Sequence, residues 1–277
     1  MTKDQIVKLS KSAINRLSIG IQSFFEDDLK SMNRAHNAQE ALKCLEIATQ
    51  YYDNITIDLI YGIPDMTLEK WHKNLEMAFS FGVNHISSYA LTVEPKTALD
   101  AFIKKGSYPS MDEDLALKHF NLLVEETKKQ GFVHYEISNF GKPYYFSKHN
   151  SSYWQGKSYI GIGPSAHSFN KTQRSWNVSN NTKYIQSIQN GVLPTTIETL
   201  TIQDQYNEYV MTGLRTIWGV SITRVASDFG IDYKFHLLIA AKSFIENGKL
   251  IIVNETIIIS EKGKFLVDGI ASELFMI

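Results

Sequence analysis

The sequence predicts an α/β protein, because short apolar runs alternate with longer amphipathic stretches through its first half. We expect strands at residues 15–22, 55–60, 85–93 and 132–137. The stretches between them reach the roughly 10 to 20 residues that helical crossovers need. Repetition of strand, helix and strand predicts a parallel sheet with right-handed crossovers.

The connecting helices are expected at residues 38–51, 68–81 and 112–130. Ala41, Leu45 and Ala48 recur at helical spacing in the first, as Trp71 and Leu75 do in the second. Residues 110–113 read Ser-Met-Asp-Glu, a capping-box pattern that we expect to open the third helix. A further helix is expected at residues 2–12.

Polar residues share one parity on three successive expected strands, near their carboxyl ends. The set comprises Ser18, Gly20 and Gln22, then Thr56 and Asp58, then Ser88, Ala90 and Thr92. In parallel α/β folds, ligands bind at this edge of the sheet. A core strand can carry a satisfied Ser or Thr, but an unpaired buried carboxylate costs on the order of several kcal/mol. The pattern therefore indicates a ligand site around Asp58.

Composition narrows the function classes. The 277 residues have a formal net charge of −1, which gives no electrostatic footprint for nucleic acid or an anionic membrane. No apolar run is long enough for a membrane span, so we expect at most peripheral membrane contact. No secretory signal is recognisable. The single cysteine, Cys44, excludes an internal disulfide and a multi-cysteine metal site, and favours a cytoplasmic location.

The second half divides into two predicted regions. Residues 141–200 read as loops rich in Ser, Asn and Tyr. Residues 201–277 read as helices at 204–218, 222–229 and 235–247, a hairpin at 250–259 and a closing helix at 263–275. Helices followed by a hairpin suggest a winged-helix-like accessory domain. Its seven Lys and Arg against nine Asp and Glu argue against a phosphate-binding face. The predicted division is therefore 1–140, 141–200 and 201–277.

Seven segments, in order along the chain, carry a resemblance. They are residues 15–24 (NRLSIGIQSF), 33–36 (NRAH), 57–64 (IDLIYGIP), 87–95 (SSYALTVEP), 135–140 (YEISNF), 149–154 (HNSSYW) and 161–168 (GIGPSAHS). Together they resemble the coproporphyrinogen dehydrogenase (HemN) group of radical S-adenosylmethionine proteins, and most closely its HemW branch. The resemblance implies an incomplete (β/α) TIM-like barrel that lacks its first strands, followed by the small helical, winged-helix-like domain.

The resemblance also implies a binding site for S-adenosylmethionine, with Gln22, Arg34, Asp58 and Thr92 as the contacting residues. The planar guanidinium of Arg34 suits the ligand's carboxylate. Gln22 or Asp58 suits its hydroxyls or amine. For Arg34 the plain alternative is a solvated charge beside a helix.

The segment HNSSYW is the motif that the HemW branch associates with haem binding. His149 would ligate the haem iron, and Tyr153 and Trp154 would pack against the porphyrin. The alternative is a loop anchored by the two aromatic residues, with His149 merely hydrogen-bonded. His167 is a reserve ligand. Its glycine-containing loop is not a phosphate cradle, because Pro164 removes a donor.

Family members hold a [4Fe–4S] cluster with a Cys-x3-Cys-x2-Cys motif that this sequence does not contain. Cys44 is expected to be a small core residue. The chain begins at a helix that resembles the one before the family's fourth strand, so we expect an N-terminal truncation, a wrong start or a missing half on a separate chain. Without earlier strands, residues 15–22 would form an unpaired edge, which invites pairing with another chain.

Three functions follow as expectations. The first is a haem chaperone that binds S-adenosylmethionine and haem in the complete protein and delivers haem to acceptor proteins. The second is a fragment of an oxygen-independent, HemN-like coproporphyrinogen III oxidase. The third is a degenerate haem-binding module. Cluster-dependent chemistry is not expected of this chain alone, since the cluster supplies the electron.

Overall fold

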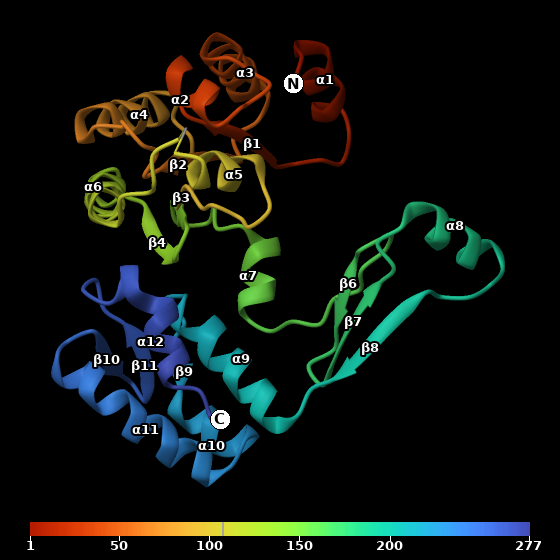
Figure 1. The fold of residues 1–277 in the computed structure, drawn as a ribbon, viewed down its shortest axis with the longest axis vertical. Helices are drawn as coiled ribbons and strands as arrows, with labels where there is room; N and C mark the ends of the chain where they lie inside the picture. The colour runs from red at the N-terminus through yellow and green to blue at the C-terminus, as the bar shows by residue number, and fades with distance from the viewer. Residues whose placement is uncertain (107) are drawn as a thin grey trace. The chain divides into compact units, whose positions relative to one another are not determined.

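The computed structural model describes residues 1–106 and 108–277, which form two compact units, Met1–Phe146 and Ser147–Ile277 (Figure 1). We call them unit 1 and unit 2 and describe each by itself. The three-part division drawn from the sequence stays a prediction.

Unit 1 is an α/β unit built on a five-stranded sheet. Its strands are β1 (Leu17–Gln22), β2 (Ile55–Tyr61), β3 (His85–Ala90), β4 (Val133–Glu136) and β5 (Asn139–Gly141). The strand order is β1-β2-β3-β5-β4. The first three strands are parallel, whereas β5 runs antiparallel to both β3 and β4. The prediction of an all-parallel sheet was therefore wrong at this edge, because a two-residue turn folds β5 back between β3 and β4.

Unit 1 has six described helices, of which four lie close to their expected positions, whereas the second and the fifth were not expected. They are α1 (Lys3–Ser10), α2 (Glu26–Ser31), α3 (Ala38–Tyr51), α4 (Leu68–Ser80), α5 (Ala98–Lys104) and α6 (Glu113–Lys129). Thr2 and Asn37 cap α1 and α3 through complete capping boxes. The predicted capping box at residues 110–113 was wrong. Asp112 is the cap of α6, since its carboxylate accepts the Leu115 N–H at 3.0 Å.

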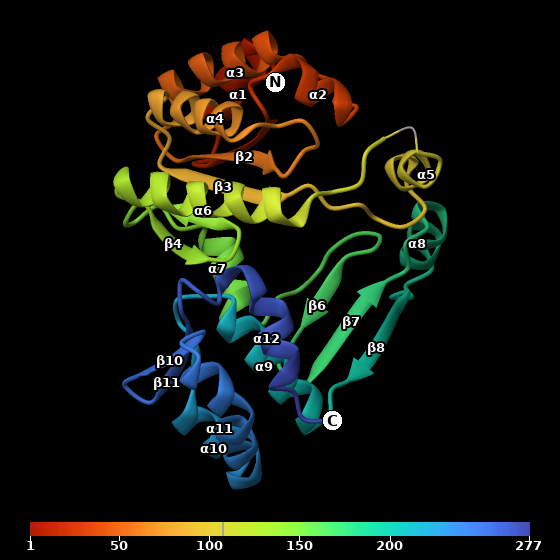
Figure 2. The same cartoon turned by 60° about the vertical axis from the view of Figure 1, so that its left-hand side comes forward.

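Helices α3, α4 and α6 lie along one side of β2 and β3 (Figure 2). The core between these layers includes Leu45, Ile57, Leu59 and Trp71, each fully buried. The Trp71 indole N–H donates to the His119 carbonyl at 2.9 Å, so the polar atom of this large side chain is satisfied. Packing on one side of the sheet leaves its other side for polar residues.

Unit 2 begins with α7 (Lys148–Trp154) and a three-stranded antiparallel sheet. The sheet comprises β6 (His167–Phe169), β7 (Gln173–Asn177) and β8 (Thr195–Thr199), with α8 (Asn181–Gln189) between the last two. The expectation of loops at residues 141–200 was wrong here. These strands bury almost nothing, and β8 is exposed at four of its five positions. Strands without a buried face show no alternation of apolar and polar residues.

The rest of unit 2 is helical with a small sheet. Its elements are α9 (Ile202–Leu214), β9 (Val220–Ser221), α10 (Ile222–Asp228), α11 (Ile231–Glu246), β10 (Leu250–Val253), β11 (Thr256–Ile259) and α12 (Val267–Glu273), with a 3₁₀ turn at Lys264–Leu266. The expected hairpin turn at Asn254 and Glu255 is confirmed, with φ of 49° and 59° at the two residues. Tyr206, Leu237 and Ile257 are fully buried in this core. None of the described helices is both long and apolar enough to cross a membrane.

Candidate functional site

The polar face of the unit 1 sheet is organised around Gly20. A β-bulge lies between Gly20 and Gln22, and Gln22 has a left-handed φ of 68°. A Cβ added to Gly20 would lie 2.6 Å from Gln22 Nε2 and 3.9 Å from Asp58 Oδ2. Because Gly20 has no side chain, the Gln22 amide lies over the backbone beside Asp58. The bulge thus brings an amide and a carboxylate together at the carboxyl end of β1.

Gln22 is a buried amide with an unpartnered oxygen, and Asp58 is a partly buried carboxylate. Gln22 is 7% exposed, and its Oε1 has no hydrogen-bond partner. Burial raises the pKa of Asp58 above its ordinary value, while a hydrogen bond from Ser18 and the charge of Arg34 act in the opposite direction. A buried acceptor without a partner carries a desolvation cost that a bound donor would remove.

Arg34 and Tyr89 complete this face. Arg34 follows α2 and is exposed, and its backbone N–H donates to the Leu29 carbonyl at 2.9 Å. Burial raises the pKa of Tyr89, as does the Asp58 charge, and the Arg34 charge lowers it. Both side chains are therefore within electrostatic reach of the Asp58 carboxylate. We call Ser18, Gln22, Arg34, Asp58 and Tyr89 the strand-end cluster.

Residue Thr92 lies outside the strand-end cluster as the structure describes it. The third strand ends at Ala90, so Thr92 follows it in an exposed position, where its hydroxyl donates to the Ala90 carbonyl at 3.2 Å. The expected parity of this strand was wrong. Asp58 pairs with Ser87, so Ser87 and Tyr89 share its face, whereas Ser88 is buried on the other side.

Two members of the strand-end cluster, Ser18 and Tyr89, were not among the predicted contact residues. Ser18 could have been predicted as a contact residue, because it lies two residues before Gly20 on the same face of the first strand. Tyr89 could have been found only from the register of β3 against β2, which sequence alternation did not give.

A second polar group lies at the amino ends of the same strands. Arg16 donates to Asn54 and Thr56, and to the Tyr145 carbonyl at 3.2 Å. The His85 ring lies 2.8 Å from the Tyr135 hydroxyl. Burial and the Arg16 charge lower the pKa of His85 to about 3, so this imidazole is neutral.

In unit 2, His149 is exposed on the short helix α7, which Ser147 caps. Its ring meets Tyr153 edge-on with centroids 4.8 Å apart, as their spacing of four residues allows. Tyr153 in turn meets Tyr159 edge-on at 4.6 Å. These contacts leave the His149 ring accessible at one end of a row of aromatic side chains.

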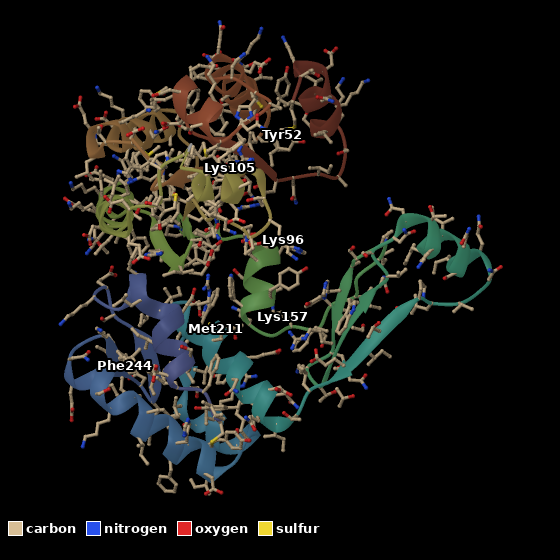
Figure 3. The ribbon with its side chains drawn as sticks, viewed as in Figure 1. Tyr52, Lys96, Lys105, Lys157, Met211 and Phe244 are labelled. Carbon is tan, nitrogen blue, oxygen red and sulfur yellow. The ribbon has the colours of Figure 1, made fainter. Side chains whose placement is uncertain are left out.

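A cavity of about 730 Å³ lies beside α7 within unit 2. Tyr153, Trp154, Tyr159 and Phe169 line it from one part of the chain, and residues of α9 and α10 line it from another. Figure 3 shows Met211, a lining residue of α9, and Lys157, which follows α7. This volume is within the usual range for small-molecule sites. His149 itself is not among the lining residues.

Several charged side chains of the cavity lining are paired with one another. Arg174 contacts Glu208 and lies 3.2 Å from Glu198. Burial raises the pKa of Glu208, and the charge of Arg174 opposes that rise. The Arg215 guanidinium lies 5.3 Å from the centre of the Trp154 ring, a cation–π contact that fixes this indole.

The reserve ligand His167 lies on β6, exposed, with its ring centre 6.2 Å from that of Trp176. The chain passes very close to it at Gly161, where an added Cβ would lie 2.1 Å from the His167 carbonyl oxygen. Any other residue at position 161 would push this backbone apart. The glycine is therefore explained by the close approach of a loop to β6 rather than by ligand binding.

The chain's one cysteine, Cys44, is buried on α3. Within residues 1–106 and 108–277, no three His, Cys, Asp or Glu side chains are placed to hold a metal ion together.

Comparison with known proteins places these features in a family context. The model of the radical SAM superfamily matches residues 1–78. The heme chaperone HemW of Bacillus subtilis is 30% identical over 268 residues, which cover 96% of this chain and 71% of that protein. The heme chaperone HemW of Mycobacterium tuberculosis is 27% identical, over 94% of this chain and 65% of that protein.

The solved structure of coproporphyrinogen III oxidase (HemN) from Escherichia coli matches with a TM-score of 0.81. The match covers 100% of this chain and 67% of that one at 20% sequence identity. At this identity the match shows the fold alone: an α/β fold of the radical SAM type.

Proposed function

Since this chain belongs to the HemW family of radical SAM proteins, we propose that the protein containing it is a haem chaperone that binds S-adenosylmethionine and haem. The chain spans 71% and 65% of the two HemW relatives named above, so the activity of a whole protein is part of this proposal. The observation that supports it is the strand-end cluster, because three of the residues that the resemblance implies, Gln22, Arg34 and Asp58, lie close together there.

The strand-end cluster fits S-adenosylmethionine by the chemistry of its donors and acceptors. The unpartnered Gln22 Oε1 can accept from an amine or hydroxyl, and the Asp58 carboxylate can do the same. Arg34 can bind the carboxylate of the ligand's amino-acid end with two parallel N–H donors. We propose Gln22, Arg34 and Asp58 as the contacts, and Thr92 as a contact only if the segment after β3 folds over the ligand.

A [4Fe–4S] cluster does not fit this chain, because one buried cysteine cannot supply three thiolates. In the complete family, S-adenosylmethionine bound to the cluster supplies radical chemistry. We propose that the thiolates come from outside these 277 residues, either from a segment of the same protein or from a separate chain that completes the barrel at β1. The acceptors of the haem would be further partners, and a cytoplasmic location agrees with a free cysteine.

We place haem at His149, with Tyr153 and Trp154 as its aromatic neighbours. The exposed imidazole and the aromatic row behind it support this proposal. A neutral imidazole is a common axial ligand of haem iron, and aromatic rings pack well on a porphyrin face. The HemN-like oxidase is a second candidate that only the shared fold favours.

A haem titration followed by the Soret band tests the haem half of the proposal. We expect a saturable shift for the wild-type chain and a loss of affinity of about tenfold or more for His149→Ala, which corresponds to about 1.4 kcal/mol. Lys148→Ala is the matched control, because it removes an exposed side chain next to His149 on the same helix. His167→Ala tests the reserve ligand, and we expect it to keep the wild-type affinity. Equal titration curves for wild type and His149→Ala would remove His149 as the ligand.

A further inference from the structure

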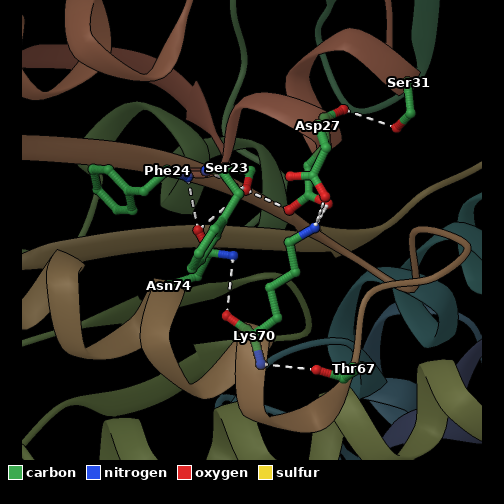
Figure 4. Close-up of polar contacts among 9 residues, drawn as sticks. Ser23, Phe24, Asp27, Ser31, Thr67, Lys70 and Asn74 are labelled. Carbon is green, nitrogen blue, oxygen red and sulfur yellow. Dashed lines mark hydrogen bonds and ion pairs between the residues drawn. The ribbon is translucent and has the colours of Figure 1, made fainter.

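A buried polar network joins the turn after β1 to helix α4 (Figure 4). Asn74 of α4 is fully buried, and its Oδ1 accepts the Phe24 N–H at 2.7 Å. The same oxygen lies 3.2 Å from Ser23 Oγ. The Ser23 hydroxyl also donates to Asp28 at 2.6 Å, and its oxygen accepts the Phe25 N–H at 3.1 Å. The turn is thus held by side chains from two different helices.

Asp28 is the second node of this network. It lies on α2, is 3% exposed, and accepts from Ser23 and from Lys70 Nζ, each at 2.6 Å. Lys70 also contacts Asp27 at 2.6 Å. A buried carboxylate is tolerated only with such partners, and removing one of them leaves an uncompensated charge. The network therefore links α2 to α4 as well as to the turn.

The network flanks two members of the strand-end cluster. Gln22 directly precedes Ser23 and holds a left-handed φ, which is costly for a residue other than glycine and needs support from its surroundings. Arg34 is the third residue after α2, the helix that contains Asp28, and its backbone N–H donates to the Leu29 carbonyl of that helix. Fixing the turn and α2 therefore fixes the backbone from which both side chains extend.

We propose that Asn74, Asp28 and Lys70 are positioning residues for S-adenosylmethionine: they hold the turn and α2 so that Gln22 and Arg34 face the ligand. The inference rests on the proposed function, in which the strand-end cluster binds this ligand. None of the three belongs to the strand-end cluster itself. The competing explanation is that the network only stabilises the fold.

Three variants of the full chain separate these explanations. Asn74→Ala removes the acceptor that holds Phe24. Gly20→Ala moves Gln22 directly, because the new Cβ would meet the flexible end of its side chain at 2.6 Å. Asn84→Ala is the control, since the Asn84 side chain donates to Asp53, far along the chain from the turn. Ser23→Ala replaces Asn74→Ala if the latter does not fold, because it breaks the link to Asp28 and keeps the bond to Phe24.

Two readouts are needed. The first is the NMR signal of the isotope-labelled Gln22 side-chain amide, which reports its position without any ligand. The second is the affinity for S-adenosylmethionine by calorimetry, well below the melting temperature of each variant. We expect Asn74→Ala and Gly20→Ala to shift the Gln22 signal and to weaken binding about fivefold or more, which is about 1 kcal/mol. Asn84→Ala should change neither.

Each result decides the proposal. A folded Asn74→Ala chain with wild-type affinity and an unmoved Gln22 signal would show that the network is only structural. A moved signal with wild-type affinity would also overturn the positioning role. If the wild-type chain does not bind S-adenosylmethionine, the proposed function fails for this chain, and the Gln22 signal alone decides whether the network sets the position of this side chain.

Discussion

Unit 1 and unit 2 hold their candidate sites in opposite ways. The strand-end cluster of unit 1 rests on neighbouring strands, with a buried amide and a partly buried carboxylate supported by a network behind them. In unit 2, His149 is exposed on a helix of seven residues and touches its neighbours through aromatic edges. A strand-built site orients a ligand through fixed polar groups, whereas an exposed imidazole suits a ligand that must be released. The difference agrees with a bound cofactor in one unit and a carried one in the other.

The largest expected effect is a pH dependence of the free energy of unfolding that comes from His85 of unit 1. His85 of unit 1 is neutral and buried, with its pKa lowered to about 3. As pH falls below about 6.5, the unfolded chain gains a proton there that the folded unit does not, so stability falls by up to about 1.4 kcal/mol per pH unit. We expect His85→Gln to flatten this slope between pH 6.5 and 4.5 in urea unfolding. Equal slopes in the two proteins would contradict a neutral His85.

The next effect is on ligand affinity in unit 1. Asp58→Ala should weaken the binding of S-adenosylmethionine about 10- to 150-fold, because a hydrogen bond to a charged group contributes about 1.5–3 kcal/mol. Calorimetric titration measures it. Asp4→Ala on the exposed helix α1 is the control. Unchanged affinity in Asp58→Ala would remove Asp58 from the site.

Substitutions at two glycines, one in each unit, should differ in their effect on the free energy of unfolding. Gly161→Ala in unit 2 would press a Cβ against the His167 backbone, and we expect a loss of about 1–3 kcal/mol in the free energy of unfolding. Gly20→Ala in unit 1 meets only the movable end of Gln22, so we expect a change within about 0.5 kcal/mol. Chemical denaturation of both variants checks the contrast. A larger loss for Gly20→Ala than for Gly161→Ala would reverse it.

The smallest effect concerns the aromatic row of unit 2. Tyr153→Ala removes the ring between His149 and Tyr159, and aromatic pairs contribute about 0.5–1.5 kcal/mol. We expect haem affinity to fall about 2- to 12-fold. Tyr144→Ala, at a fully exposed tyrosine, should leave the Soret titration as it is. An unchanged haem affinity in Tyr153→Ala would show that this ring does not contribute to the haem site.

Sequence alternation located most of unit 1 and little of the first part of unit 2. Strands β1 and β2 and helices α3 and α4 were confirmed to within two residues, because β1 and the two helices each bury an apolar face and β2 is an apolar run that is buried almost throughout. The face of Asp58 followed from the same alternation. Strands β6 to β8 were not predicted, because neither of their faces is well buried and their sequences therefore show no alternation of apolar and polar residues.

The finer geometry of the strand-end cluster was out of reach of the sequence. Gln22, with its left-handed φ, directly precedes a turn that is hydrogen-bonded by Asn74 and Asp28 from two other helices, and such long-range contacts cannot be read from alternation along one strand. The parity of β3 failed because Ser88, a polar residue, is buried on the helix side, while Tyr89 lies on the polar face. Hydrophobicity patterns cannot distinguish a buried serine from an exposed one.

We propose that the two units bind two different ligands, and a crossed titration is the sharpest test of this proposal. The wild-type chain, Asp58→Ala and His149→Ala would each be titrated with S-adenosylmethionine and with haem. The account predicts that Asp58→Ala loses affinity only for S-adenosylmethionine and that His149→Ala loses affinity only for haem. A folded variant that loses affinity for both ligands would contradict the proposal of two separate sites.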